Sequence, residues 1–173
     1  MSKVTAYGER SVLVEEIEPS GLLESIRNAL PKSEVRAGLE SLVITFSEKG
    51  DHVVEVEQLL MQIKPGPVSG TSKLVTLPVH YSGEDLEIAA ELASLTTQQL
   101  IQAHTSITWK VKLIGFAPGF PYLVPAEKSA EADLLAAVGR LSVPRRQVPA
   151  GSVGIAAGMS CVYPAVMPGG WHL

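Results

Sequence analysis

The sequence predicts a mixed fold, with a small α+β domain at 1–81 and a mainly β domain at 82–173. Two observations support this prediction. Up to about residue 81, apolar residues recur with strand and helix periodicities in the order strand, helix, strand, strand, helix, strand. Beyond that part, turn-forming residues become dense: of the 15 Gly and 12 Pro residues in the chain, 15 lie in 115–173.

The order of elements in the first domain is that of a split β-α-β, ferredoxin-like fold. Both helices carry apolar residues three and four positions apart, which is typical of a helix with one buried face. Ser20 and Asp51 precede the helices as candidate N-caps. Pro78 indicates that the last strand lies at an edge or contains a bulge. The expected elements are a strand at 11–15, a helix at 20–30, strands at 33–37 and 41–47, a helix at 51–63, a loop at 64–72 and a strand at 73–81.

The second domain is expected to begin with helices and to continue as short strands. Two capping-box spacings, in which Ser or Thr precedes Asp or Gln by three residues, mark the helix starts. A later segment alternates apolar and polar residues, as a half-buried strand of an antiparallel sheet or barrel does. The dense turns after it predict an irregular barrel or sandwich. The candidate caps are Ser82 and Thr96, the expected helices 84–94, 97–104 and 128–138, and the alternating strand 107–113.

Composition and charge argue against several classes of function. The net charge of −4 disfavours a nucleic-acid partner held by general electrostatics. No apolar run approaches the ~20 residues of a membrane span, and the N-terminus lacks a signal-peptide pattern, so we expect a cytoplasmic protein without a membrane partner. Cys161 is the only cysteine and is expected to be a buried apolar residue. The four histidines have no metal-ligand spacing, so no metal site is expected.

The first candidate for chemistry is the stretch GFAPGFPY at 115–122. A Pro-Gly turn, whose Gly can take a positive φ, holds aromatic side chains on either side of it. Such a rigid turn could form a pocket wall, or it could be a hydrophobic plug at the end of a barrel. The candidate ligand-contacting residues are Phe116, Pro118, Gly119, Phe120 and Tyr122.

The second candidate is the stretch 140–158, in which three arginines lie among prolines. Arginine on a stiff loop suits a carboxylate or a phosphate. The small residues that follow are expected to offer free backbone N–H groups, as in an anion nest. The alternative is a solvated basic loop followed by a bulged strand. The residues concerned are Arg140, Arg145 and Arg146, and then Gly151, Ser152 and Gly154.

Two further residues stand apart from these stretches. Trp171 follows a Pro-Gly-Gly turn, which favours a core tryptophan over a ligand contact. His104 ends a predicted helix, where a partly positive imidazole is favourable. A catalytic role for His104 is open, but its spacing from other residues does not indicate one.

Four motifs in order resemble the carboxyltransferase-domain subunit 1 family. This family includes the B component of bacterial 5-oxoprolinase, the so-called allophanate hydrolase subunit 1 and a sporulation histidine-kinase inhibitor. The same domain occurs at the C-terminal end of urea carboxylases. The motifs are GFAPGFPYL at 115–123, VPAGSVGI at 148–155, YP at 163–164 and PGGW at 168–171, and matching segments also lie at 7–15, 77–81 and 85–105.

The resemblance implies a small α+β domain followed by a cyclophilin-like β-barrel. It implies a hydrolase subunit that is active only with a second, carboxyltransferase-like subunit and a third, barrel-type subunit. Such a hetero-oligomer would use ATP, bound through the complex, to open the lactam of 5-oxoproline to glutamate. No metal or prosthetic group is implied for this chain. In this context Arg140, Arg145 and His104 are the candidate catalytic residues, and the stretches around 116–122, 151–154 and Trp171 would contact substrate.

The chain also departs from the family pattern. Gly139 replaces the proline of the first Pro-Arg step, and 159–161 reads Met-Ser-Cys where the family has Gln-Thr-Gly. The family continues after Trp171 with strands that close the barrel, whereas this chain ends at Leu173, so an open barrel edge is expected. A second function therefore stays open, that of a regulatory module that binds and inhibits a sensor histidine kinase without catalysis of its own.

Overall fold

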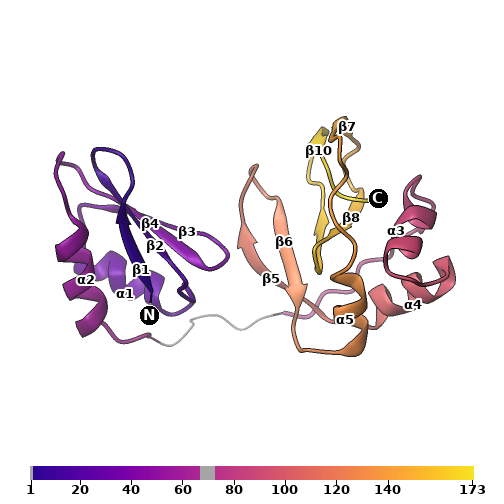
Figure 1. Ribbon diagram of the computed structural model, residues 1–173, viewed down its shortest axis with the longest axis horizontal. Helices are drawn as coiled ribbons and strands as arrows, with labels where there is room; N and C mark the ends of the chain where they lie inside the picture. Colours follow the sequence, from indigo (N-terminus) through magenta and orange to yellow (C-terminus); the bar gives the residue numbers. More distant parts are fainter. Residues whose placement is uncertain (1, 67–72) are drawn as a thin grey trace. The chain divides into compact units, whose positions relative to one another are not determined.

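The computed structural model describes residues 2–66 and 73–173, so most of the expected loop at 64–72 lies outside the described residues. The chain divides into two compact units, residues 1–75 and residues 76–173 (Figure 1).

The first unit is a four-stranded antiparallel sheet with two helices on one face (Figure 1). The strand order is β1-β2-β4-β3, and β2 pairs with β4 along its whole length, from Ser11 opposite Thr45 to Glu15 opposite Ser41. The elements are β1 (Lys3–Ala6), β2 (Ser11–Glu15), α1 (Leu22–Ala29), β3 (Glu34–Ala37), β4 (Ser41–Thr45) and α2 (Val53–Gln62).

The prediction of a strand at 73–81 is wrong, because the described residues 73–83 contain neither strand nor helix. In a split β-α-β fold the last strand would pair with β2. That position is occupied by β1, which forms a hairpin with β2 through the short turn at 7–10. Closing so short a loop costs less conformational entropy than returning a distant segment to the same edge. The alternation in 73–81 indicates an extended chain but not a hydrogen-bonded partner.

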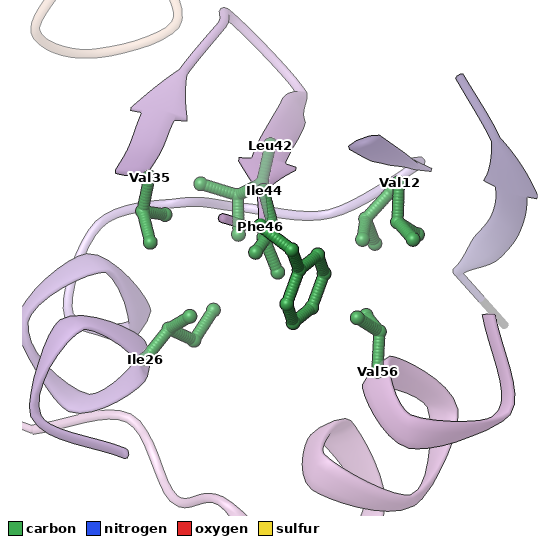
Figure 2. Packing of buried hydrophobic residues seen from close by; sticks show 8 residues of the cluster. Val12, Ile26, Val35, Leu42, Ile44, Phe46 and Val56 are labelled. Carbon is green, nitrogen blue, oxygen red and sulfur yellow. The ribbon is translucent and has the colours of Figure 1, made fainter. Parts of the chain in front are cut away.

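The core of the first unit lies between the sheet and its two helices. Along β2 and β4 every second side chain is buried, as expected for strands with one face in the core. Figure 2 shows Ile26 of α1 and Val56 of α2 pointing toward the strand residues, with the ring of Phe46 between them. The buried cluster comprises Val12, Val14, Ile26, Val35, Leu42, Ile44, Phe46 and Val56.

The starts of these helices differ from the expected caps. Gly21, with φ +80°, is the N-cap of α1, and no side chain caps this helix, so the assignment of Ser20 is wrong. A Cβ on Gly21 would lie 2.7 Å from the carbonyl oxygen of Gly66. The Gly66 N–H donates to the Gly21 carbonyl at 2.8 Å, which holds the two backbones close together. The Asp51 carboxylate accepts from the Val53 N–H at 3.0 Å, although His52 is the residue at the N-cap of α2.

The second unit has three short helices, a four-stranded sheet of order β5-β6-β9-β8 and a two-stranded sheet of β7 and β10. Because the described strands form two separate sheets, a closed barrel stays a prediction. Two buried clusters support the unit, one among the helices and one in which Phe120, Tyr163 and Trp171 pack with smaller apolar residues. The elements are α3 (Leu86–Leu92), α4 (Thr97–Ser106), β5 (Trp109–Ile114), β6 (Pro121–Pro125), α5 (Ala130–Leu135), β7 (Arg145–Val148), β8 (Val153–Ala156), β9 (Met159–Val162) and β10 (Met167–Gly169).

The capping box predicted at Thr96 is confirmed, and the one predicted at Ser82 is wrong. At α4 the Gln99 N–H donates to the Thr96 hydroxyl at 3.2 Å, and the Thr96 N–H donates to the Gln99 side chain at 2.9 Å. At α3 the N-cap is Asp85 rather than Ser82, and no side chain caps the helix. The Asp85 carboxylate is engaged elsewhere, with Arg145 and with the N–H of Leu173.

The core of the first unit can be tested on one helix. Val56 is fully buried, whereas Val54 on the same helix is 62% exposed. We expect Val56→Ala to lower the free energy of unfolding by about 2–3 kcal/mol, through lost burial and the cavity that remains. The matched Val54→Ala should change it by less than about 0.5 kcal/mol. Urea unfolding followed by circular dichroism measures both, and equal effects of the two substitutions would contradict this packing.

Candidate functional site

The second unit contains a cavity of about 540 Å³. Its walls come from the segment before α3, from the inward faces of α3 and α4, from the turn that leads into β8, and from the end of the chain. Leu86, Ala89, Leu100, Val153 and Ile155 give it an apolar lining. Its polar lining consists of His80, Tyr81, Ser82, Glu84, His104, Ser152 and His172.

The helix α4 and the turn before β8 place two polar residues, His104 and Ser152, at the cavity. The capping box fixes the start of α4, and Leu100 and His104, four residues apart, share its buried face. On the opposite wall, the turn at 149–152 turns sharply at Gly151, which has φ +84°. This turn places Gly151 and Ser152 in the lining.

The backbone at this turn does not form the expected anion nest. The Gly151 N–H donates to the Tyr163 carbonyl at 2.7 Å, and the Ser152 N–H donates to the Pro149 carbonyl at 3.2 Å. Gly154 serves packing, because a Cβ there would lie 3.2 Å from the Cys161 sulfur and 3.2 Å from the Trp171 Cβ. Since both N–H groups already donate to backbone carbonyls, the expectation of free donors for an anion is wrong.

His104 is the centre of a hydrogen-bonded chain at the cavity wall. Its Nδ1 lies 2.7 Å from the Tyr81 hydroxyl, and its Nε2 lies 3.0 Å from the Ser160 hydroxyl. Trp109 packs against the imidazole ring and donates its indole N–H to the His104 carbonyl at 3.1 Å. Burial lowers the pKa of His104 to about 4, so the ring is neutral at pH 7.

The hydrogen bonds to Tyr81 and Ser160 limit the proton transfers that His104 can carry out. A neutral imidazole has one donor and one acceptor nitrogen, and both nitrogens already have partners. In one of the two proton arrangements Ser160 donates to Nε2, and Nδ1–H donates to Tyr81, which leaves the Tyr81 proton free to point into the cavity. Burial raises the pKa of Tyr81, so its hydroxyl keeps that proton at neutral pH. In this arrangement the Tyr81 hydroxyl has a proton to donate, and the hydrogen bond from His104 orients it.

Arg145 is part of an ion pair and not of the cavity lining. Its guanidinium contacts the Asp85 carboxylate at 2.6 Å and the Glu84 carboxylate at 3.1 Å. Asp85 is buried and also accepts from the Leu173 N–H at 3.0 Å. Burial acts to raise the pKa of Asp85, but the hydrogen bonds from Arg145 and Leu173 outweigh it and lower that pKa. The pair therefore joins the start of α3, β7 and the end of the chain.

The stretch 115–122 contributes no residue to the cavity lining, and within it only Phe120 is fully buried in the core, whereas Phe116, Pro118 and Gly119 are exposed. The Phe120 ring is buried and makes edge-to-face contacts with Tyr122, Tyr163 and Trp171 at centroid distances of 5.2–6.3 Å. Gly119 has the positive φ expected of it, at +78°. The contacts of Phe120 are those of a hydrophobic plug, the alternative to a pocket wall. Trp171 belongs to the same core cluster, as its place after the turn favours, and its implied contact with substrate stays a prediction.

The structure thus brings together only part of the predicted set. His104, Gly151 and Ser152 line one cavity. Phe116 is 66% exposed, and the Arg140 guanidinium lies 5.9 Å from the centre of the Trp171 ring. The residues of the predicted set outside this lining are Arg140, Arg145, Phe116, Pro118, Gly119, Phe120, Tyr122, Gly154 and Trp171.

Sequence patterns do not indicate the roles of three residues that shape this region, Tyr81, Asp85 and His172. The strand pattern places Tyr81 at the end of a strand, and the capping-box spacing includes Asp85. His172 has no metal-ligand spacing to another histidine. Its side chain is buried, and its Nδ1 has no hydrogen-bond partner in the described chain. The adjacency of His172 to a core tryptophan is the one signal in the sequence that could indicate a buried histidine.

Metal and thiol chemistry find little support in the part of the chain that the structure describes. Residues 2–66 and 73–173 contain no group of three or more His, Cys, Asp or Glu residues placed to hold a metal ion. Cys161 is buried as expected, and burial raises the pKa of its thiol to about 12, so the thiolate is not available at neutral pH. No helix among the described residues is long and apolar enough to cross a membrane.

The ion pair can be tested by removing its cation. Arg145→Ala leaves the buried Asp85 carboxylate without its charge partner, and we expect a loss of about 3–5 kcal/mol in the free energy of unfolding. Arg146 is the next residue and is exposed, so Arg146→Ala should change stability by less than about 0.5 kcal/mol. Both tryptophans lie in the second unit, so tryptophan fluorescence during urea unfolding follows this unit. A normal unfolding curve for Arg145→Ala would contradict a structural role for the pair.

His104 gives a pH dependence with a defined sign. Its pKa falls from 6.5 to about 4 on folding, so the folded state binds fewer protons. The stability that this neutral imidazole contributes is complete above pH 6.5 and is lost as the pH falls through 4, by up to about 3 kcal/mol. His104→Gln should lack this component while keeping any acid sensitivity due to Asp85. Tryptophan-monitored unfolding between pH 7 and 4 measures the difference, and parallel pH profiles would show that His104 titrates normally.

Comparison with known proteins agrees with the motifs. The chain is 43% identical over 104 residues to the B component of 5-oxoprolinase from Bacillus subtilis (strain 168), covering 58% of this chain and 41% of that protein. It is 34% identical over 146 residues to the B component of 5-oxoprolinase from Haemophilus influenzae, covering 81% of this chain and 65% of that protein. The chain thus spans less than two thirds of the length of these curated relatives.

One solved structure and one protein family match a larger part of this chain than these two relatives do. The crystal structure of TTHA0988 superposes with a TM-score of 0.69 at 25% identity, over 95% of this chain and 34% of that one. The family described as carboxyltransferase domain, subdomain C and D, matches residues 4–173. This range includes nearly all of both units, and the resemblance drawn from the motifs is confirmed. The chain therefore belongs to the family of the carboxyltransferase domain, subdomain C and D.

Proposed function

We propose that this chain is part of a subunit of an ATP-dependent complex that hydrolyses an amide or lactam bond, with 5-oxoproline as substrate and glutamate as product. The observation that carries the proposal is the 34% identity, over 81% of this chain, to a protein named as a 5-oxoprolinase component. The complex would be cytoplasmic and would contain a carboxyltransferase-like second subunit and a barrel-type third subunit.

In this proposal the cavity of the second unit contributes a hydrogen-bond donor to the reaction. Tyr81 lines the cavity, and its hydroxyl is hydrogen-bonded to His104, which in turn bonds to the buried Ser160. A phenol that receives a hydrogen bond from the imidazole can donate its own proton to the carbonyl oxygen of an amide. That donation stabilises the negative charge that develops on the oxygen when water attacks the carbonyl carbon.

ATP would be held by another part of the complex. A triphosphate is usually bound by lysine, arginine, a metal ion or a run of free backbone N–H groups. The described lining residues include neither lysine nor arginine, and the N–H groups of Gly151 and Ser152 already donate to the carbonyls of Tyr163 and Pro149. The residues here do not fit the nucleotide, so we assign no step of ATP chemistry to this chain.

Reconstitution tests the proposal. The chain is co-expressed with the carboxyltransferase-like and barrel-type subunits of its source, and phosphate release and glutamate formation are measured with 5-oxoproline and ATP. We expect both to depend on all three subunits. Tyr81→Phe should lower kcat by about 100-fold, as the loss of one donor to a developing oxyanion does, with a smaller effect on KM. The control Tyr7→Phe, at a tyrosine that is 59% exposed, should leave kcat unchanged.

Two results would contradict the proposal. A complex that assembles but releases no phosphate in response to 5-oxoproline would reject this substrate. Capture of a sensor histidine kinase in place of the two subunits would favour the regulatory function instead. Unchanged kcat in Tyr81→Phe would leave the family assignment intact and remove the tyrosine from the mechanism.

A further inference from the structure

Ser160 is the buried end of the hydrogen-bonded chain that runs through His104 to Tyr81. It lies in β9 and is only 1% exposed. Its hydroxyl lies 3.0 Å from Nε2 of His104, and residues 2–66 and 73–173 offer this hydroxyl no second hydrogen bond. Tyr81, at the other end of the chain, is only half-buried. The two hydroxyls that flank the imidazole therefore have different surroundings.

The imidazole of His104 can carry its proton in two ways. It is neutral, so one ring nitrogen donates and the other accepts. If Nε2 carries the proton, Nε2 donates to Ser160, and Tyr81 donates to Nδ1. If Nδ1 carries the proton, Nδ1 donates to Tyr81, and Ser160 donates to Nε2. The two arrangements differ in which hydroxyl proton stays without an acceptor in the described chain.

The burial of Ser160 decides between these arrangements. With the proton on Nε2, the unused hydroxyl proton is that of Ser160, at the buried end of the chain. A buried donor without an acceptor loses its hydrogen bond to water and gains none in return. With the proton on Nδ1, the unused proton is that of Tyr81, at the less buried end. The Nδ1–H arrangement is therefore the favourable one.

The ring orientation of His104 is also fixed. A ring turned by 180° about its Cβ–Cγ bond would place carbon atoms toward both hydroxyls and lose both hydrogen bonds. Trp109 packs against the ring at a centroid distance of 5.1 Å, and its indole N–H donates to the His104 carbonyl. Since the ring cannot exchange its partners, the choice of tautomer depends on what Nε2 receives from Ser160.

We propose that Ser160 is a positioning residue that holds His104 in the Nδ1–H tautomer and thereby makes the Tyr81 hydroxyl a hydrogen-bond donor. Ser160 touches no ligand in this inference and acts through two other side chains. With the opposite tautomer, Nδ1 would bind the Tyr81 proton, and the hydroxyl would have only lone pairs to offer. The use of this donor in catalysis rests on the proposed function, whereas the tautomer rests on the geometry of the chain.

The tautomer can be measured in the full chain, without substrate or partner subunits. Imidazole ¹⁵N NMR shifts distinguish a protonated from an unprotonated ring nitrogen, and the His104 signals are those missing from His104→Gln. At pH 7 we expect the Nδ1–H form to exceed the Nε2–H form by at least about fivefold. Ser160→Ala should lower this ratio by about fivefold. Ser160→Thr keeps the hydroxyl and should retain the wild-type ratio.

A matched control is available on the helix that carries His104. The Ser106 hydroxyl donates to the Ala103 carbonyl at 2.9 Å and has no contact with the imidazole nitrogens. Ser106→Ala removes a serine hydroxyl from the same helix and should leave the ratio of the two tautomers unchanged.

Kinetics of the reconstituted complex separate positioning from a merely structural role. Ser160→Ala should lower kcat about tenfold, with KM little changed, and Ser160→Thr should restore most of the loss. In a chain that already carries Tyr81→Phe no phenol proton remains, so adding Ser160→Ala should lower kcat no further.

An Nε2–H tautomer in the wild-type chain would overturn the inference, and this measurement does not depend on the folding of any variant. An unchanged tautomer ratio in Ser160→Ala, or additive losses of kcat in the double variant, would overturn it as well. A complex that is inactive toward 5-oxoproline, although its chain shows the Ser160-dependent tautomer, would reject the proposed function and leave this inference standing.

Discussion

The buried Asp85 carboxylate is the interaction on which the second unit depends. It accepts hydrogen bonds from Arg145 in β7 and from the N–H of Leu173, and it stands at the start of α3. Three segments that are far apart in sequence are therefore joined at one charged group. Because the carboxylate is removed from water, it stays there only while both donors are present. The same contact fixes the end of the chain next to His172, and so it helps to define one wall of the cavity.

The second unit separates its aromatic core from its cavity. Phe120, Tyr122, Tyr163 and Trp171 pack edge to face, which uses their large apolar area for stability. The cavity instead has small aliphatic walls and a few polar side chains. The family motifs thus contribute in two ways, since the GFAPGFPY stretch builds the core that holds Trp171, and the turn at Gly151 supplies the cavity wall.

The electrostatics of the cavity indicate which kind of ligand group it suits. The described lining contains no lysine or arginine, and His104 stays neutral at physiological pH. Such a site can orient an amide by hydrogen bonds, but it is poorly suited to a nucleotide. A reaction that couples ATP to amide hydrolysis would therefore need its phosphate-binding groups outside this cavity.

The sequence by itself determined the family, the main helices, the capping box at Thr96 and the alternation of β2 and β4, because these depend on local spacing and on motif order. It also singled out His104, Gly151 and Ser152, which line the cavity. Only the tertiary structure decided which extended segment pairs with β2, since alternation in 73–81 looks the same with or without a partner strand. It also decided that Arg145 is bound to Asp85 and that His172 lines the cavity, because charge partners and burial arise from residues 60 or more positions apart.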